Sequence, residues 1–419
     1  MKIQRVLIDG FKNLSNVDMT FGRMTSIVSV NNFGKSNFLQ GINFGVQFIK
    51  ATPNQKVLML QAKNVMPFNK SNFGKSFKFE IETNVTIDEI SYSTIYSLEA
   101  TWGYKPEDIS IKKEVLKIKK NEPYQKYEMV LKRTDNSCLY KASPTGRCST
   151  ALKLEPMELG INKLKAFDNL YFVDIIKKIN ELSLYMEDTL DPRAMYNADP
   201  VIIKGIGDVM FMSNNLPRVL YKLKEIDINR YELIKNTFMA LFPNVIELNV
   251  EELKVNVGNA KLPDDSPLMI SDSIYVLSLK DKNLVAPINF EAMSDGAKRI
   301  LVLLTRIILA EMSNVALIAI EEPENSIHPS LLNSYIQVIS QLLDDSKLVF
   351  TSHSPYIISY LPNESVYAGL PDGEGGAIFK RVKTNVLSKD AAEVDELVGD
   401  YLFSLLSDDS DMIKDYIED

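Results

Sequence analysis

The sequence predicts an α/β protein whose central sheet is mixed and covered by helices. Three short apolar runs, at residues 26–30, 315–320 and 347–350, are typical of buried parallel strands because they lack polar alternation. The first run leads into a glycine-bearing loop and a helical pattern, and the other two end in carboxylate or imidazole side chains. Open α/β sheets bind ligands at the carboxyl ends of their strands, so these ends form the candidate site.

The chain has the composition of an ordinary globular protein. Its 419 residues exceed one ordinary core and suggest roughly two or three domains. Hydrophobic residues make up 45% and charged residues 24%, which excludes the disordered, collagen-like and coiled-coil classes. The start lacks the apolar region of a secretory signal, and no stretch reaches the ~18 apolar residues of a membrane span. The two cysteines form no Cys-x-x-Cys pair, so we expect neither a disulfide framework nor a cysteine zinc site. From all these features together, we expect a cytoplasmic protein with no membrane partner.

Negative charge is concentrated towards the C-terminal end. The net charge is -8, and residues 387–419 hold eleven acids against two lysines, so the remainder is close to neutral. A chain-wide basic footprint for nucleic acid is therefore missing. Residues 112–133 do carry a cluster of lysines interleaved with Tyr124 and Tyr127, which suits either a local nucleic-acid contact or the solvated face of strands.

An N-terminal lobe is expected over residues 1–150. Strands are predicted at residues 3–8, 17–21 and 26–30, and a helix follows the third strand. Beyond residue 77, apolar and polar residues alternate between turns rich in Pro, Asn, Asp and Gly, which is the pattern of a β-meander.

Three further segments are predicted. Residues 151–245 change to a helical period and indicate a helical insertion that serves as an arm or a dimerisation surface. Residues 246–386 return to strand patterns and contain a long helix at 295–312, which completes a second lobe. The acidic segment 387–419 has apolar residues at helical spacing, so it either packs on its own core or docks a partner.

Residues 29–36, Ser-Val-Asn-Asn-Phe-Gly-Lys-Ser, stand between a strand and a helix, where a phosphate-binding loop is found. Backbone N–H groups of the loop and of the helix start would cradle phosphates. Lys35 would neutralise the β- and γ-phosphate oxygens, and Ser36 would hold Mg²⁺. Ser29 replaces the usual first glycine, and a plain helix-start turn is the alternative reading. The predicted nucleotide contacts here are Asn31, Asn32, Gly34, Lys35, Ser36 and Asn37.

Glu321 and Glu322 close the apolar run at residues 315–320. Adjacent residues at a strand end point in opposite directions, so one carboxylate can face Mg²⁺ while the other orients an attacking water. We assign Glu321 to the metal and Glu322 to the catalytic base. A solvated acidic loop is the alternative, although acids rarely close so apolar a strand.

Ser294 and Gly296 open the long helix at residues 295–312. The Ser294 hydroxyl, the Gly296 backbone and the helix dipole can all present donors to an anion. This predicts two more nucleotide contacts, and an N-cap with no other role is the alternative.

The two histidines each follow a predicted strand. His353 lies within Thr-Ser-His-Ser-Pro, where a neutral imidazole can hydrogen-bond the γ-phosphate or the attacking water, so we predict a catalytic role. His328 is expected to stabilise the turn after the acidic strand.

The phosphate loop, the Ser-Asp-Gly helix, the Glu-Glu-Pro-Glu strand end and the histidine motif resemble, in this order, the ABC-type ATPase domain of the OLD (overcoming lysogeny defect) family. RecF- and SMC-like heads are related to that domain. Phe11-Lys12-Asn13 and the segments 34–37, 216–220 and 241–243 extend the resemblance over nearly the whole chain. A clearly placed Q-loop glutamine is lacking.

The resemblance implies an ABC-type P-loop head with an N-terminal β-meander lobe and an inserted helical subdomain. It implies ATP and Mg²⁺ as cofactors, hydrolysis to ADP and phosphate, and a homodimer or higher homo-oligomer. In that assembly, Ser294 of one subunit completes the site that another subunit forms with Lys35, Ser36, Glu321, Glu322 and His353.

OLD nucleases carry a TOPRIM domain after the histidine motif, and we expect none in this chain. Stand-alone relatives occur in anti-phage systems such as PARIS, Septu and some retrons. The resemblance therefore implies a sensor or scaffold subunit that controls a separate effector, a nuclease or toxin. Two alternatives stay open: a DNA-repair or recombination ATPase that binds DNA directly, and a nucleotide-gated scaffold with little hydrolysis, motivated by Ser29.

Overall fold

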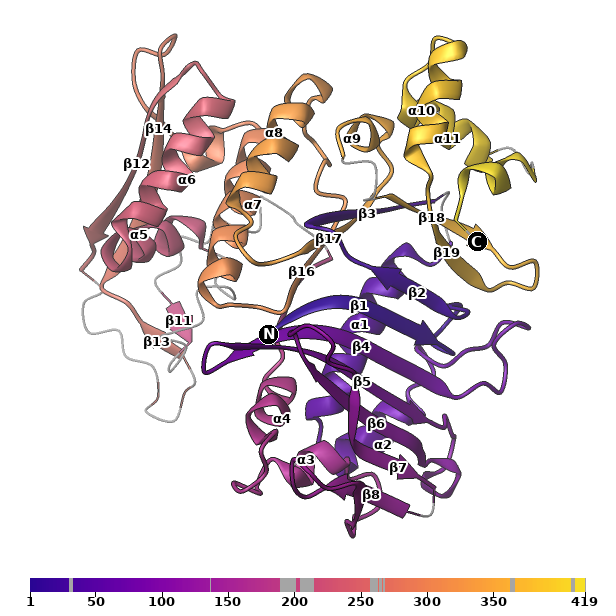
Figure 1. Ribbon diagram of the computed structural model, residues 1–419. Helices are drawn as coiled ribbons and strands as arrows, with labels where there is room; N and C mark the ends of the chain where they lie inside the picture. The colour runs from indigo at the N-terminus through magenta and orange to yellow at the C-terminus, as the bar shows by residue number, and fades with distance from the viewer. Residues whose placement is uncertain are drawn as a thin grey trace. The chain divides into compact units, whose positions relative to one another are not determined.

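The computed structural model, drawn in Figure 1, forms two compact units. The first unit comprises Met1–Asp188, Asn314–Glu322 and Asp345–Asp419, and the second comprises Thr189–Ser313 and Pro323–Asp344. The predicted α/β class is confirmed, although these units divide the chain differently from the predicted segments because strand pairing joins residues far apart in sequence. The structure describes residues 1–29, 33–135, 137–188, 201–203, 215–256, 263, 266, 268–361, 366–407 and 411–418.

An antiparallel sheet of eight strands forms the meander of the first unit, in the order β2-β1-β4-β5-β6-β7-β8-β9. Along β4, residues alternate between buried and more exposed positions, so one face of the sheet is apolar and packs on helices. The predicted meander is thus observed. Its strands are β1 (Lys2–Asp9), β2 (Val17–Thr20), β4 (Phe77–Ile87), β5 (Ile90–Ala100), β6 (Ile111–Lys120), β7 (Glu128–Thr134), β8 (Ser137–Lys141) and β9 (Cys148–Ala151).

A second sheet of the same unit has the order β10-β16-β17-β3-β18-β19, and all its neighbours pair in parallel except β18 and β19. The three apolar runs that predicted parallel strands are its three central strands, and nearly all their residues are buried. The strands are β10 (Leu184–Glu187), β16 (Leu317–Glu321), β17 (Leu348–Ser352), β3 (Met24–Val28), β18 (Val366–Pro371) and β19 (Ala377–Arg381).

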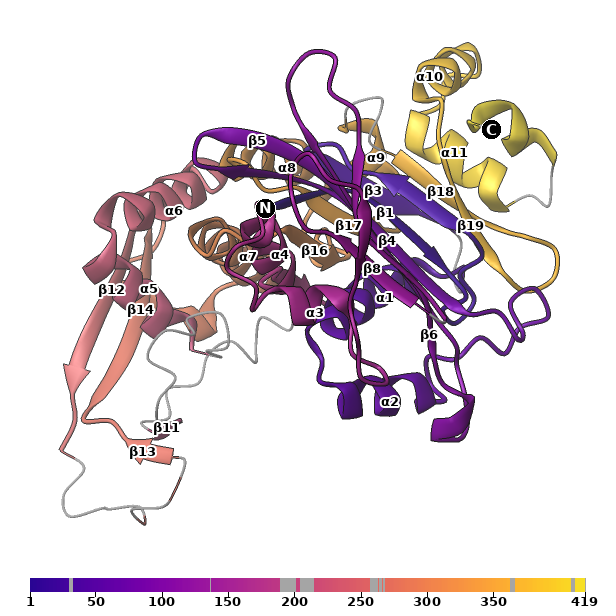
Figure 2. The same cartoon turned by 60° about the horizontal axis from the view of Figure 1, so that its bottom comes forward.

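Helices complete the first unit. α1 follows β3, and its buried residues Phe38 and Ile42 belong to the core shared with the meander. Figures 1 and 2 both show α10 and α11, in yellow, beside β18 and β19. The helices are α1 (Lys35–Lys50), α2 (Pro53–Gln61), α3 (Gly160–Leu164), α4 (Val173–Asn180), α9 (Pro355–Ser359), α10 (Thr384–Glu393) and α11 (Val398–Ser407), with short 3₁₀ turns η1 (Pro106–Asp108) and η4 (Asp411–Tyr416).

Two expectations about local structure are corrected or decided here. The helical period was predicted to run through Leu184, but Leu184 begins strand β10 and pairs with Leu317 of β16. Apolar spacing in this stretch fits both periods, and parallel pairing selects the strand. In the acidic segment, Leu402 and Leu405 are buried, which favours a helix packed on its own unit.

Within the residues that the structure describes, the second unit contains four helices, a three-stranded sheet and a two-stranded sheet. Asp227 caps one of these helices, because its side chain accepts a hydrogen bond of 3.1 Å from the Arg230 N–H. No helix in the described ranges is both long and apolar enough for a bilayer crossing. The elements are α5 (Leu216–Ile226), α6 (Ile228–Leu241), α7 (Asp295–Met312), α8 (Pro329–Leu342), β11 (Val201–Ile203), β12 (Val245–Lys254), β13 (Leu268–Ile270), β14 (Ser273–Asp281), β15 (Ile288–Asn289) and η3 (Phe290–Ala292).

A fully buried carboxylate attaches the segment around residue 160 to the meander. Glu114 on β6 accepts hydrogen bonds from the Gly160 N–H at 2.7 Å, the Ile161 N–H at 3.1 Å and the Tyr96 hydroxyl at 3.0 Å. Burial raises the pKa of Glu114 above its ordinary value, and the three donors oppose that rise. The carboxylate thus satisfies three polar groups that water does not reach.

We predict that Glu114→Ala lowers the free energy of unfolding of the first unit by ~2 to 4 kcal/mol, because it leaves buried donors without an acceptor. The only tryptophan, Trp102, belongs to this unit, so its fluorescence in a urea titration measures the change. Glu107→Ala removes an exposed carboxylate and serves as the control. An unchanged urea midpoint in Glu114→Ala would contradict the role given to this carboxylate.

Candidate functional site

Three parallel strands of the first unit end side by side. Glu321 of β16 pairs with Thr351 of β17, and Ser352 of β17 pairs with Val28 of β3. The residues that follow these strands surround a pocket of about 230 Å³. It is lined by Phe33, Gly34, Lys35, Ser36, Asn37, Glu322, Thr351 and His353. Six predicted site residues therefore meet in one place, while Asn31 and Asn32 lie outside the described residues.

Gly34 ends the predicted phosphate loop in a conformation that favours glycine, with φ at +81°. A Cβ atom at this position would lie 3.0 Å from the Ala377 Cβ and 3.1 Å from the Asn13 Oδ1. Helix α1 begins at the next residue, and no side chain in the described part of the protein caps it. Its first N–H groups therefore suit an anionic ligand such as a phosphate.

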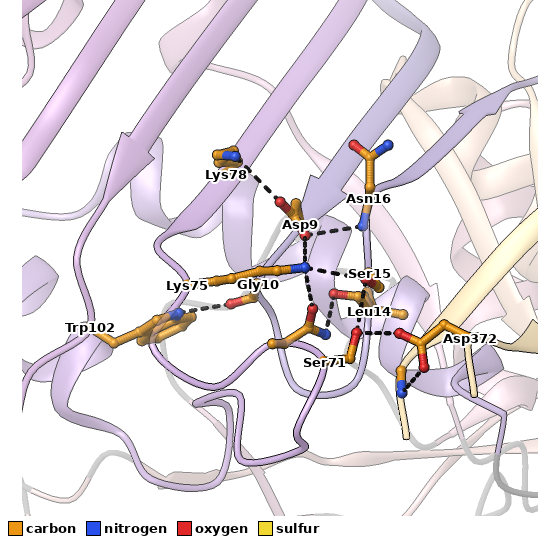
Figure 3. Close-up of polar contacts among 12 residues, drawn as sticks. Asp9, Gly10, Leu14, Ser15, Asn16, Ser71, Lys75, Lys78, Trp102 and Asp372 are labelled. Carbon is orange, nitrogen blue, oxygen red and sulfur yellow. Dashed lines mark hydrogen bonds and ion pairs between the residues drawn. The ribbon is translucent and has the colours of Figure 1, made fainter. Parts of the chain in front are cut away.

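Asn13 and Ala377 lie next to Gly34, and a polar network holds the turn between β1 and β2 that contains Asn13, as Figure 3 shows for the residues around it. Asn13 accepts hydrogen bonds from Asn37 Nδ2 at 2.8 Å and from the Ala377 N–H at 2.6 Å. At the start of this turn, Trp102 Nε1 donates to the Gly10 carbonyl at 2.8 Å. The network also contains Lys75 with Asp9 at 3.6 Å and Ser71 bonded to Asp372. Sequence analysis did not identify Asn13 and Ala377 as supports of the loop.

Lys35 is almost completely buried and already has local partners. Its Nζ donates to the Ser29 carbonyl at 2.9 Å and to the Ser29 Oγ at 3.1 Å. Ser29 is itself fully buried at the end of β3. The ammonium group therefore lies at the base of the phosphate loop, where it can meet the oxygens of a bound phosphate.

The Glu321 carboxylate accepts a hydrogen bond from the Ser36 hydroxyl. Burial raises the pKa of Glu321, and a hydrogen bond from Ser36 lowers it without cancelling the rise. The negative charges of Asp188 and Glu322 raise the pKa further. A carboxylate and a hydroxyl in contact are a donor set that Mg²⁺ accepts when phosphates and water complete its shell.

No group of three or more His, Cys, Asp or Glu side chains within the described residues is arranged to hold a metal ion. Asp188 was missed from the sequence because β10 was read as helix. Its signal was an acidic pair, Glu187-Asp188, closing an apolar run, as Glu321-Glu322 does.

Glu322 leaves the extended conformation of its strand. Its φ is +46°, in the left-handed region that non-glycine residues rarely adopt, and its N–H donates to the Thr351 carbonyl at 3.1 Å. A strained residue persists where surrounding contacts hold it, and such residues concentrate at functional sites. The turn places Glu322 Oε1 3.4 Å from His353 Nε2.

The His353 imidazole has a lowered pKa. Burial is the larger cause, the positive charge of Lys35 adds to it, and Glu322 opposes both. A pKa below the ordinary value leaves the ring neutral near pH 7. A neutral ring can hydrogen-bond a phosphate oxygen or a water, which is the state that the sequence analysis required.

The remaining predicted contacts lie in the second unit. The Ser294 Oγ accepts a hydrogen bond of 3.3 Å from the Ala297 N–H and caps α7, so the expected capping is confirmed. A Cβ atom on Gly296 would lie 2.5 Å from the Ser326 carbonyl oxygen, so only glycine fits there. His328 caps α8 by accepting from the Ser330 N–H at 3.3 Å, as predicted.

Comparison with known proteins identifies the fold and a partial family match. Residues 211–359, less than half of the chain, match the family described as "AAA domain, putative AbiEii toxin, Type IV TA system". No curated protein matches the sequence. A solved SmcHead bound to the C-winged helix domain of ScpA is 12% identical, with a TM-score of 0.50 over 93% of this chain and 100% of that one.

Two other solved structures are more distant in shape. The SMC head domain from Thermotoga maritima is 11% identical, with a TM-score of 0.43 over 91% of this chain and 99% of that one. An Smc head domain with an extended coiled coil, bound to the C-terminal domain of ScpA derived from Pyrococcus furiosus, is 13% identical, with a TM-score of 0.42 over 94% and 100%. The first structure establishes the fold, which is the predicted ABC-type α/β head.

We predict that nuclear magnetic resonance titration will give His353 a pKa below that of a free histidine, in a spectrum simplified by the presence of only two histidines. Lys35→Ala should raise this pKa because it removes a repelling charge, and Glu322→Gln should lower it because it removes an attracting one. His328 serves as the internal control. A lower His353 pKa in Lys35→Ala, or a higher one in Glu322→Gln, would show that the site electrostatics are misassigned.

Proposed function

We propose that this protein is an ABC-type ATPase that binds ATP with Mg²⁺ and hydrolyses ATP to ADP and phosphate. The supporting observation is the pocket in which Lys35, Ser36, Glu322 and His353 meet at the ends of three parallel strands. Phosphoryl transfer needs backbone N–H donors, a cation, a metal site and a base. The site provides the uncapped N-terminus of α1, the buried Lys35 ammonium, the Ser36 hydroxyl bonded to Glu321, and the Glu322 carboxylate.

The residues divide the chemistry among them. Lys35 neutralises negative charge on the transferred phosphate, and the backbone around Gly34 and the first turn of α1 orient the phosphates. Ser36 and Glu321 hold Mg²⁺, which when bound neutralises phosphate charge. The Glu322 carboxylate accepts a hydrogen bond from the attacking water and takes its proton. Neutral His353, 3.4 Å from Glu322, hydrogen-bonds the γ-phosphate or that water.

A second copy of the chain completes the site in this proposal. Ser294 and the backbone of Gly296 open the 18-residue helix α7, whose N-terminal dipole favours an anion. The γ-phosphate of ATP bound to one subunit would meet this helix start from another. ATP would then hold a homodimer or larger oligomer together, and hydrolysis would release it.

In the cell, we place the protein in the cytoplasm as the sensor or scaffold subunit of a prokaryotic anti-phage system that controls a separate nuclease or toxin. The resemblance to stand-alone OLD-like ATPases supports this role. The matched family is described by a toxin of a type IV toxin–antitoxin system, which belongs to the same class of biology. The similar SMC heads bind ScpA domains, so this fold can carry a partner protein.

Direct DNA binding has weaker support from the lysine-rich strands. Lys113 of β6 lies opposite Glu99 of β5. Lys119 lies over the Tyr127 ring at 5.0 Å, and the Tyr127 hydroxyl donates to Glu82 at 2.9 Å. Carboxylates therefore interleave with the cations and reduce the attraction of this face for phosphates. DNA binding that weakens steeply with salt would restore this alternative.

We predict Mg²⁺-dependent ATP hydrolysis by the purified chain, lost by roughly a hundredfold or more in Lys35→Ala and in Glu322→Gln. Glu322→Gln should still bind ATP and should accumulate as a larger ATP-bound assembly, because it lacks only the base. Native mass measured with and without ATP checks this result. Lys105→Ala and Glu107→Gln change exposed residues of the same types and should retain full activity.

The trans arrangement makes a separate prediction. Lys35→Ala and Ser294→Arg chains should each be inactive, but an equal mixture that exchanges subunits should recover about a quarter of the unaltered activity. Half of the dimers are then mixed, and each mixed dimer contains one complete site. A mixture that stays inactive although mixed dimers are detected would contradict the composite site.

A further inference from the structure

Ser29 occupies a place where a glycine is the usual residue, and its side chain points to the lysine of the loop. The side chain is fully buried at the end of β3, and its Oγ accepts a hydrogen bond of 3.1 Å from Lys35 Nζ. The Ser29 carbonyl accepts a second bond from the same group at 2.9 Å. Residue 29 thus holds, through two hydrogen bonds, the ammonium group on which phosphate binding depends.

A glycine on the adjacent strand provides the space for Ser29. β18 pairs in parallel with β3, with Ala368 opposite Val28, so the next residue, Gly369, lies beside Ser29. A Cβ atom on Gly369 would lie 2.9 Å from the Ser29 Cβ, closer than real Cβ contacts. Ser29 replaces the usual first glycine of the loop, and Gly369 on the neighbouring strand leaves room for its side chain.

A side chain at residue 369 could not avoid Ser29 by moving to the other side of β18. Its strand partner on β19 is Phe379, whose ring would lie 2.8 Å from the same added Cβ atom. The Phe379 ring packs 5.7 Å from the ring of Phe38, which is buried in the first turns of α1. The β18–β19 hairpin therefore packs against Ser29 through Gly369 and against the start of α1 through Phe379.

We propose that Ser29 is a positioning residue that holds Lys35 in the nucleotide-free site, and that Gly369 is the partner residue that makes this possible. This inference rests on the proposed nucleotide function. Binding of a phosphate turns Lys35 away from the Ser29 hydroxyl, so each binding event breaks one existing hydrogen bond. The serine therefore moderates nucleotide affinity instead of supplying it.

The sign of the effect tests the proposal. Ser29→Ala keeps the Cβ atom and removes the hydroxyl, so it removes the competing hydrogen bond. We predict that it tightens binding of the non-hydrolysable analogue AMP-PNP, measured by calorimetry with Mg²⁺, by about two- to tenfold. If the hydroxyl were merely structural, its removal would weaken binding or leave it unchanged, and either result would overturn the proposal.

Ser26→Ala is the matched control. Ser26 lies on the same strand, is fully buried, and its Oγ has no hydrogen-bond partner within the described residues. It should therefore leave the dissociation constant for AMP-PNP close to that of the unaltered chain. A tightening equal to that of Ser29→Ala would show that loss of any buried hydroxyl on β3 has this effect, and would overturn the assignment to Ser29.

The Gly369 part is tested by a double-mutant cycle. Gly369→Ala should weaken AMP-PNP binding roughly tenfold when residue 29 is serine and several-fold less in a Ser29→Gly background, because the two Cβ atoms then no longer meet. Equal losses in both backgrounds would place the whole clash on Phe379 and overturn the pairing. An unaltered chain that binds no AMP-PNP would contradict the proposed function itself, whereas binding with the wrong response to these variants would contradict only this inference.

Discussion

The parallel pairing of β3, β17 and β16 is the constraint on which the site depends. Each strand contributes its polar residues immediately after its last paired residue, so the register that aligns Glu321 with Thr351 and Ser352 with Val28 also aligns the chemistry. The strands are mostly apolar and almost entirely buried, so a slip in register would leave apolar residues unburied. The same hydrophobic burial that stabilises the sheet thus fixes the distances within the pocket.

Several residues around this edge of the sheet have a conformation or an environment that is energetically unfavourable. Glu322 adopts a left-handed backbone, Lys35 is buried, and the carboxylates of Glu321 and Asp188 are close enough for their charges to oppose each other. A nucleotide with Mg²⁺ would bring positive charge to the carboxylates and negative charge to Lys35. A ligand of this class would therefore reduce the repulsion between the carboxylates and balance the charge of Lys35.

The sequence predicted the central strands and the residues after them because a run of apolar residues with a polar end has few other interpretations. It did not predict β10, because the spacing of Leu184 and its neighbours fits a helix as well as a strand. Asp188, which follows β10, was therefore not predicted as a residue of the site. Nor did it predict the left-handed turn at Glu322. The supports at Asn13, Ala377 and Gly369 come from segments far from the loop in sequence, so only the folded register reveals them.

The most direct measurement of the central claim is an experimental structure of Glu322→Gln with ATP and Mg²⁺. We predict that the phosphates lie against Gly34 and the start of α1, and that Lys35 Nζ turns from Ser29 to the phosphate oxygens. Mg²⁺ should lie on Ser36 and Glu321, and Ser294 of a second copy at the γ-phosphate. ATP bound away from the ends of β3, β16 and β17, or no bound ATP at saturating concentration, would contradict it.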